Sequence, residues 1–235
     1  QGVGNGNLPS NNVLSILRDK DNSIWVGTDD GIGIIYCSDN VLGNCEATLP
    51  IIQQDQFAGF LFKGEQVQSM AIDGANQKWI GTQNGVWLIS ADAKQIIHHV
   101  TVNNSPLLSN DIKKIAVDPT TGEVYFATFN GLCSYRSTAT EASEDKSNIL
   151  VFPNPVPPQY NGQIAIRGLA ENTLIKITEL NGRLVYQTRS LGGQAVWNGR
   201  DYVGNKIASG VYLVLARDGK GMENIITKIV ITSGR

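Results

Sequence analysis

The stretch Ser-Ile-Trp-Val-Gly-Thr-Asp-Asp-Gly at residues 23–31 occurs, with changes, three times along the chain. It returns as Gln-Lys-Trp-Ile-Gly-Thr-Gln-Asn-Gly at 77–85, and more weakly as Glu-Val-Tyr-Phe-Ala-Thr-Phe-Asn-Gly at 123–131. The threonine recurs after 54 residues and again after 46, a spacing typical of β-propeller blades. The repeated residues that we expect to be structural are Trp25, Gly27, Thr28, Gly31, Trp79, Gly81, Thr82, Gly85, Thr128 and Gly131.

Each copy places an aromatic-rich run, an Asp-Gly or Asn-Gly pair and a second apolar run in that order. Glycine and asparagine tolerate φ > 0, so this pattern predicts a β-hairpin with a two-residue type I′ turn. Gly27, Gly81 and Ala127 lie in mid-strand, where a larger side chain is usual. At these positions we expect the backbone of a neighbouring segment to approach closely.

The pattern predicts four strands in each of the first two blades and three in the last. The expected strands are 13–19, 23–28, 32–37 and 46–52, then 67–73, 77–82, 86–90 and 95–102, then 112–118, 123–128 and 132–135. Three blades cannot close a ring, which needs at least about four. Either further blades lie upstream in a longer protein, or the chain associates with copies of itself and covers its open edges. The chain opens at Gln1 without a Met or a leader, so we expect a piece of a longer, exported protein.

From residue 137 the sequence no longer follows the propeller repeat. Residues 137–148 are too polar for an outer strand and are expected to form a linker. Short strands then follow at regular spacing: an apolar one from 149 that a Pro-Asn-Pro turn ends, then 163–167, 174–179, 183–188, 194–197, 211–216 and 225–231. Seven short strands in this space favour a β-sandwich of immunoglobulin-like size. The predicted fold is therefore all-β: a partial, three-bladed β-propeller at 1–136, a polar linker at 137–148 and an immunoglobulin-like β-sandwich at 149–235.

Charge is divided unevenly between the halves. Residues 1–134 carry 7 Lys/Arg against 13 Asp/Glu, whereas residues 150–235 carry 10 against 5, although the net charge of the chain is only −2. A basic tail could favour anionic partners such as acidic glycans or phosphate-bearing lipid heads, but its basic residues are dispersed, as on an ordinary protein surface. No nucleic-acid partner is expected. No apolar run reaches the roughly 18 residues of a membrane helix, so the chain is not expected to span a membrane.

Residues that could carry chemistry are few. Cys37 and Cys45 bracket a polar loop short enough for a disulfide in an oxidising compartment, and Cys133 is expected to be a buried thiol. His98 and His99 are the only histidines, and on a strand their side chains point to opposite faces, which prevents both from binding one metal ion. We expect no metal, no cofactor and no enzymatic activity.

Three further polar or aromatic features have structural explanations. Asp-Lys-Asp-Asn at 19–22 has part of a calcium-loop pattern, but is better explained as a turn in which side chains bond their own backbone. Trp25 and Trp79 could line a ligand funnel, although packing between blades is the favoured interpretation. Trp-Asn-Gly-Arg-Asp at 197–201 is read as a structural corner with Arg200 and Asp201 close together, and only secondly as a docking surface.

Two motif sets resemble known families. Ser-Asn-x-Val followed by Trp-Val-Gly-Thr-x-Asp-Gly-Ile resembles the two-component-regulator propeller repeat, best known from periplasmic sensor regions. In the tail, five blocks occur in order: Val-Phe-Pro-Asn-Pro at 151–155, Asn-Gly-Arg-Leu-Val at 181–185, Trp-Asn-Gly-Arg-Asp at 197–201, Gly-Asn-Lys-Ile-Ala-Ser-Gly-Val-Tyr at 204–212, and Lys-Ile-Val-Ile at 228–231. Together they resemble the C-terminal sorting domain of the Bacteroidetes type IX secretion system.

The combination is similar to the C-terminal portion of a family of cell-surface components of that system. The resemblance implies an outer-membrane attachment complex as partner, including its sortase, and a part in presenting anionic lipopolysaccharide to that sortase. It also implies a retained tail, a location at the cell surface and no bond chemistry. The residues that we expect to dock or to bind an anionic glycan are Arg167, Arg183, Arg189, Arg200 and Lys206.

Two other functions stay open. In secreted cargo the tail would be a removable sorting signal, and the mature protein would end near the linker. A periplasmic glycan-sensing ectodomain would need a membrane helix after the propeller, where this chain carries the sorting-like tail instead.

Overall fold

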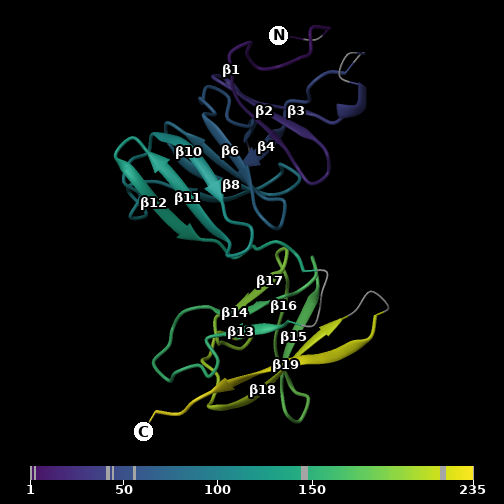
Figure 1. Cartoon of the computed structure of the whole chain (residues 1–235), viewed down its shortest axis with the longest axis vertical. Helices are drawn as coiled ribbons and strands as arrows, with labels where there is room; N and C mark the ends of the chain where they lie inside the picture. Colours follow the sequence, from purple (N-terminus) through teal and green to yellow (C-terminus); the bar gives the residue numbers. More distant parts are fainter. Residues whose placement is uncertain are drawn as a thin grey trace. The chain divides into compact units, whose positions relative to one another are not determined.

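A computed structural model describes residues 2, 4–40, 43, 45–54, 57–143, 148–217 and 221–234 (Figure 1). The chain divides into two compact units, Gln1–Ser137 and Thr138–Arg235, which are considered one at a time. Within the described ranges the regular structure is all-β apart from one short 3₁₀ turn, Ser38–Asn40. The chain thus consists of a partial propeller followed by a β-sandwich.

The first unit holds three antiparallel sheets that correspond to the three sequence repeats, within the described residues (Figure 1). The first sheet contains β1 (Val13–Arg18), β2 (Ile24–Thr28) and β3 (Gly31–Ile35). The second contains β6 (Ser69–Ile72), β7 (Lys78–Thr82), β8 (Gly85–Ile89) and β9 (Ile96–Val100). The third contains β10 (Ile112–Val117), β11 (Glu123–Thr128) and β12 (Gly131–Arg136).

The prediction of an outer strand at 46–52 in the first blade is wrong. Thr48 makes a single bridge to Ile34, and the chain then forms a separate hairpin of β4 (Ile51–Gln54) and β5 (Phe57–Phe60). Pro50 stands between the bridge and β4. Because proline has no N–H to donate, a fourth strand of the blade could not continue its ladder through this position.

The turn after each repeated threonine differs from the type I′ turn that the sequence predicts. Thr28 pairs directly with Gly31, so Asp29 and Asp30 are the central residues, and neither has a positive φ. A type I′ turn requires φ > 0 at both. Instead, only Gly31 has a positive φ (113°), while the Thr28 hydroxyl donates to the Gly31 carbonyl (2.9 Å) and accepts from the Asp30 N–H (3.1 Å). The same threonine bonds recur at Thr82 and Thr128, so the threonine closes the turn in all three copies.

Gly27 and Gly81 make room for side chains of a neighbouring segment. The prediction that a neighbouring backbone approaches them is wrong. A Cβ built on Gly27 would lie 2.6 Å from Cγ1 of Val67, which precedes the next blade's first strand. One on Gly81 would lie 2.6 Å from Cγ2 of Ile112 at the start of β10. A β-branched side chain of each following blade therefore fits into the space above a glycine of the blade before it.

The aromatic residues of the repeat pack between blades. Trp25 joins a buried cluster with Val67, Met70 and Ile80 of the second blade. Trp79 is fully buried against the third blade, with ring centroids 5.7 Å from Phe126 and 5.6 Å from Tyr135. Neither tryptophan lines an open funnel, because their side chains form the apolar core of the blade interfaces.

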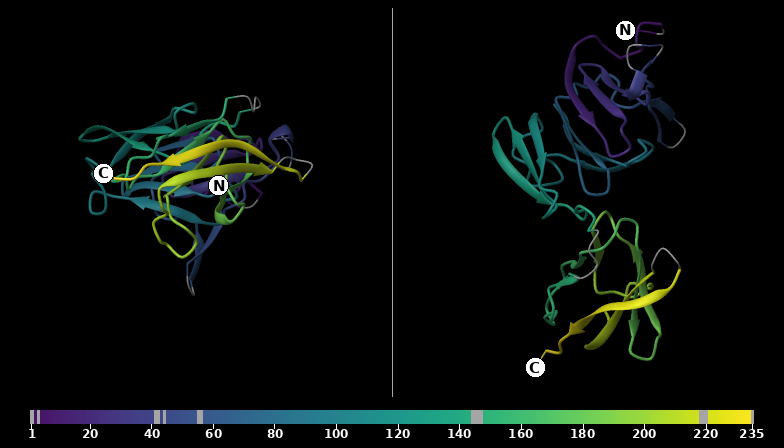
Figure 2. Two further views of the ribbon diagram at one scale, coloured as in Figure 1. Left: turned by 90° about the horizontal axis from the view of Figure 1, so that it is seen from below. Right: turned by 45° about the vertical axis from the view of Figure 1, so that its right-hand side comes forward.

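The second unit is a sandwich of two antiparallel sheets, within the part of the chain that is described. One sheet has the order β13 (Leu150–Phe152), β14 (Ile164–Arg167), β17 (Gln194–Trp197). The other has the order β16 (Leu184–Arg189), β15 (Leu174–Glu179), β18 (Gly210–Arg217), β19 (Glu223–Ile231), and its long strands β18 and β19 run side by side in Figure 2. These are the seven strands that the sequence predicts. Their inward side chains form one core around Ile166, Ile177, Trp197 and Val214.

The Pro-Asn-Pro turn covers part of the outer edge of β19. The side-chain amide of Asn154 donates to the Lys228 carbonyl (3.0 Å) and accepts from the Val230 N–H (3.0 Å). Val156 then pairs with Ile231 in parallel orientation. Asn154 therefore makes with its side chain the two bonds that a residue of a neighbouring strand would make with its backbone.

The described part of the expected linker packs on the second unit. The Gly193 N–H donates to the Thr140 carbonyl (2.8 Å), and the Ser143 N–H donates to the Leu169 carbonyl (2.9 Å). Thr140 also pairs with Gly192. Residues 138–143 thus belong to the sandwich unit, which begins at Thr138, whereas the sequence predicts a polar linker at 137–148, of which 144–147 lie outside the described residues. The segment is held by hydrogen bonds of its backbone, which do not depend on side-chain type. Its polar composition therefore does not indicate that it is packed.

Candidate functional site

The five basic residues singled out in the tail all bond groups of their own domain. Arg183 pairs with Glu179 on the β15–β16 hairpin, which holds the pKa of that carboxyl below its usual range. The other four bonds are Arg167 Nε to Gln194 Oε1 (2.7 Å), Arg189 to the Asn172 carbonyl (3.0 Å), Arg200 to the Gly204 carbonyl (2.7 Å) and Lys206 Nζ to the Pro158 carbonyl (2.8 Å). These bonds orient the side chains, so each cation is presented from a fixed position.

The five residues divide among different parts of the surface. Arg183 and Lys206 both line a hollow of about 360 Å³. Lys206 also lines a smaller one with Arg200, whereas Arg189 lines a separate hollow of about 460 Å³ together with Arg217. The structure therefore brings Arg183, Arg200 and Lys206 to neighbouring hollows and places Arg189 at another.

The hollow beside Arg183 combines charge with exposed apolar surface. Tyr202 and Val203, which line it, are 60% and 83% exposed, and Leu184 is 42% exposed. Large apolar side chains that gather around a hollow with charged residues are typical of interaction surfaces. This hollow therefore combines exposed apolar side chains with two acidic residues, Glu179 and Asp201, and two basic ones, Arg183 and Lys206.

The Trp-Asn-Gly-Arg-Asp motif forms a structural corner beside this surface. The Asp201 carboxylate accepts from the N–H groups of Val203 (2.9 Å) and Asn205 (2.8 Å), which lowers its pKa. The buried Trp197 ring donates from Nε1 to the Arg200 carbonyl (2.8 Å). Asp201 is thus bonded to backbone and Arg200 to the Gly204 carbonyl, so each shapes the loop that presents Tyr202.

The first unit contains a buried ion pair that the sequence patterns did not predict. Lys78 Nζ of β7 lies 3.0 Å from Asp19 Oδ2, and both side chains are almost fully buried (0% and 4% exposed). The Trp25 indole N–H also donates to Asp19 Oδ2 (3.0 Å), and Lys78 lies 4.6 Å over the Trp25 ring and donates to the Ala91 carbonyl. Burial alone would raise the pKa of Asp19, but these partners outweigh it and lower the pKa. The sequence does contain an indication of this pair. Lys78 occupies the repeat position at which the other copies have the apolar residues Ile24 and Val124.

The second blade lacks this arrangement. Asp73 takes the place of Asp19, and its Oδ1 accepts from the N–H groups of Ala75 and Gln77. No lysine reaches it from the third blade, where Val124 occupies the equivalent position. Burial raises the pKa of Asp73 to about 6. Asp19 and Asp73 both close turns between strands, which supports the turn interpretation of 19–22 over a calcium loop.

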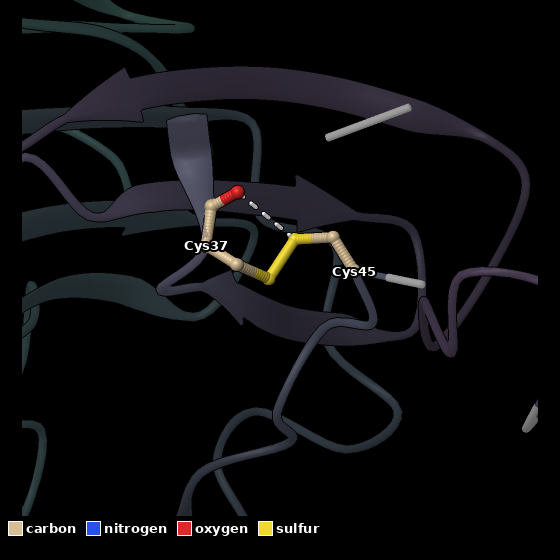
Figure 3. The surroundings of a disulfide bond; sticks show 2 residues. All are labelled: Cys37 and Cys45. Carbon is tan, nitrogen blue, oxygen red and sulfur yellow. Dashed lines mark hydrogen bonds between the residues drawn. A yellow bond between two sulfur atoms is a disulfide. The ribbon is translucent and has the colours of Figure 1, made fainter. Parts of the chain in front are cut away.

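The cysteine and histidine side chains have structural surroundings. Cys37 and Cys45 are joined in a disulfide with Cα atoms 5.8 Å apart (Figure 3), and Cys133 is a half-buried free thiol. His99 stacks on Trp87 with ring centroids 3.4 Å apart, and its Nε2 is 2.9 Å from the Asn84 carbonyl. Among the described residues no group of three or more His, Cys, Asp or Glu side chains could hold a metal ion, and no helix could cross a membrane.

Comparison with known proteins gives two family matches. Residues 7–30 match the family described as two component regulator propeller, and residues 150–232 match the secretion system C-terminal sorting domain. No curated protein sequence matches the chain.

Solved structures are similar to this chain across most of its length. PorZ of Porphyromonas gingivalis, described as an essential bacterial surface component of the type-IX secretion system, is similar over 94% of this chain with 32% identity and a TM-score of 0.64. The chain spans 30% of the length of PorZ. The extracellular domain of a hybrid two component system of Bacteroides thetaiotaomicron is similar over 96% of this chain and 39% of its own length, with 18% identity and a TM-score of 0.39.

Proposed function

Since the chain joins regulator-type propeller blades to a secretion-system C-terminal sorting domain and resembles the C-terminal portion of PorZ, we propose that it is a surface component of a type IX secretion system. The observation that carries the proposal is the similarity to PorZ across both units, since a sorting domain alone would fit any exported cargo. The role is one of assembly at the outer membrane, without bond chemistry. The propeller supplies a rigid body and the tail supplies the docking surface.

The finer proposal is that the protein belongs to the attachment complex and assists a sortase in anchoring cargo to anionic lipopolysaccharide. The tail's excess of basic residues supports this, as do the backbone carbonyls that orient Arg189, Arg200 and Lys206, because an oriented cation loses less freedom when it binds an anion. The apolar rim at Tyr202 and Val203 would contact a protein partner of the complex.

Mass spectrometry of the protein at the cell surface tests the main proposal. A resident component retains its tail to Arg235, whereas secreted cargo, the second candidate function, would end near residues 137–148. The sorting domain favours both functions equally, so the C-terminus of the surface-located protein separates them. A population that ends before the sandwich would overturn the proposal of a resident component.

Binding to purified anionic lipopolysaccharide tests the finer proposal. The triple variant Arg183→Glu, Arg189→Glu, Lys206→Glu is expected to bind at least tenfold more weakly. The matched control is Arg18→Glu, Lys63→Glu, Lys94→Glu in the first unit, which changes the net charge equally and should leave binding within about twofold. Equal loss in both variants would indicate attraction by net charge alone, and no loss in either would remove lipopolysaccharide as the ligand of the tail.

A further inference from the structure

Residues 138–143, here called the strap, are the first residues of the second unit and pair with the segment that leads into β17. The strap bonds the sandwich through the Thr138 carbonyl, both backbone groups of Thr140 and the Ser143 N–H. Their partners are residues of the segment 191–194 and Leu169. Backbone groups engaged in this way are not available to a second binder.

The sandwich is shaped to receive the strap. A Cβ built on Gly193 would lie 2.1 Å from the Glu141 carbonyl oxygen, so only glycine lets the strap approach. Gln194 is buried, and its side-chain N–H donates to the Thr138 carbonyl (3.1 Å) while its Oε1 accepts from Arg167. Arg167 therefore holds Gln194 in the orientation that reaches the strap, and Thr140 is only 4% exposed.

We propose that the strap protects the junction between the units from proteolysis and so keeps the sorting domain attached. An endopeptidase binds its substrate as an extended segment whose backbone groups are free, and a paired segment must open first. The inference rests on the proposed function, since it gives a physical reason why a resident component would keep a tail that cargo loses. It assigns Gly193, Gln194 and Arg167 to the retention of the tail.

Digestion of the whole chain with subtilisin, with the cut sites mapped by mass spectrometry, tests the proposal. Gly193→Ala should displace the strap and raise the rate of cutting at the 138–143 bonds at least tenfold. Gln194→Glu keeps the shape and the contact with Arg167 but removes the donor to Thr138, so it should raise the rate severalfold. The matched control is Gly234→Ala, where the new Cβ meets an ordinary contact at 3.8 Å and no change is expected.

Two outcomes overturn the proposal. One is cutting within 138–143 of the unaltered chain as fast as in Gly193→Ala. The other is faster cutting that occurs only together with cuts inside β14 or β17, which would mean that the variant had unfolded the sandwich. If Gly193→Ala fails to fold, amide exchange of the unaltered chain decides: the Gly193 and Ser143 N–H groups should exchange at least tenfold more slowly than in an unstructured peptide.

These measurements are independent of the test of the proposed function. A protected strap in a protein whose tail is nevertheless missing at the cell surface would refute the proposed function and the strap's role in retention, while the resistance of the strap itself to digestion would stand. An unprotected strap in a protein that retains Arg235 would refute the strap proposal alone.

Discussion

Lys78 shows how one residue can couple two blades. Its ammonium group comes from the second blade, bonds a carboxylate of the first and lies over the face of the Trp25 ring. Taking both charges out of water is costly, so the pair adds little net stability compared with apolar residues of the same size. Removing one partner, however, leaves the other charge buried and uncompensated.

We therefore expect Lys78→Met to lower the free energy of unfolding of the first unit by about 3–5 kcal/mol. Urea unfolding followed by tryptophan fluorescence measures it, since three of the four tryptophans lie in that unit. Lys94→Met is the control, because its pair with Asp92 is exposed and should contribute no more than about 1 kcal/mol. A loss below about 1 kcal/mol for Lys78→Met would contradict the coupling.

Asp73 makes the stability of the first unit depend on pH. Its pKa in the folded protein is about 6, above the ordinary 3.8, so the folded state favours the protonated acid. This contribution to stability is present below about pH 4 and is lost as the pH rises through 6, by about 3 kcal/mol in total. Asp19, whose pKa is lowered, acts in the opposite direction and only in more acidic solution.

Unfolding measured between pH 4.5 and 7.5 should therefore show a decline in stability for the unaltered chain that is absent in Asp73→Asn. The asparagine keeps an oxygen for the Ala75 and Gln77 N–H groups but cannot ionise. Parallel pH profiles of the two proteins would rule out Asp73 as the cause.

At the scale of elements, each blade is matched to its neighbour by one glycine. Gly81→Ala places a methyl group 2.6 Å from Ile112 Cγ2, and overpacking of this kind costs about 1–3 kcal/mol. Ile112→Ala should relieve most of the clash, so a double-mutant cycle in urea should give a favourable coupling. Gly59→Ala, with no atom within 4 Å of the new Cβ, should change stability by less than about 0.5 kcal/mol. If the changes in the free energy of unfolding for Gly81→Ala and Ile112→Ala simply added in the double variant, the proposed fit of Ile112 against Gly81 would be wrong.

The elements also show what the sequence could predict and where it failed. The repeat located ten strands of the three blades, and the regular spacing of short strands located all seven strands of the tail, because both patterns are local. The outer strand at 46–52 failed because Pro50 interrupts its ladder, and the type I′ turns failed because the Thr28 hydroxyl closes a different turn. The Lys78–Asp19 pair and the strap depend on contacts between distant segments, which a local pattern does not contain.

At the scale of the molecule, the outermost blades present faces that are buried elsewhere in the array. Ile112 and Ile115 of the third blade are 0% and 3% exposed, whereas the equivalent Val13 and Ile16 of the first are 41% and 68% exposed. On the other side, Tyr125 and Leu132 replace the fully buried Trp79 and Val86 and are 41% and 67% exposed. Within the array, the face that carries Ile112 and Ile115 packs against the face that carries Trp79 and Val86. The exposed face of the first blade can therefore pack in the same way against the exposed face of the third blade of a second copy.

We expect the 235-residue chain on its own to form a head-to-tail dimer, since two arrays of three blades make a ring within the usual range of about 4–8. Sedimentation at micromolar concentration should give twice 25.4 kDa. Ile16→Lys should yield monomer, whereas Leu180→Lys, at an equally exposed residue of the tail (68%), should not. A monomeric unaltered chain would contradict self-association and favour upstream blades as the missing cover.

Asn154 limits how the larger sheet of the tail can be extended at its β19 edge. Its side-chain amide occupies backbone groups of β19 that an added strand would need for pairing. A sheet ended in this way cannot be lengthened past Lys228 by a stray strand from an adjacent molecule. A strand from an adjacent molecule that approached this part of the edge would find the Lys228 carbonyl and the Val230 N–H already occupied.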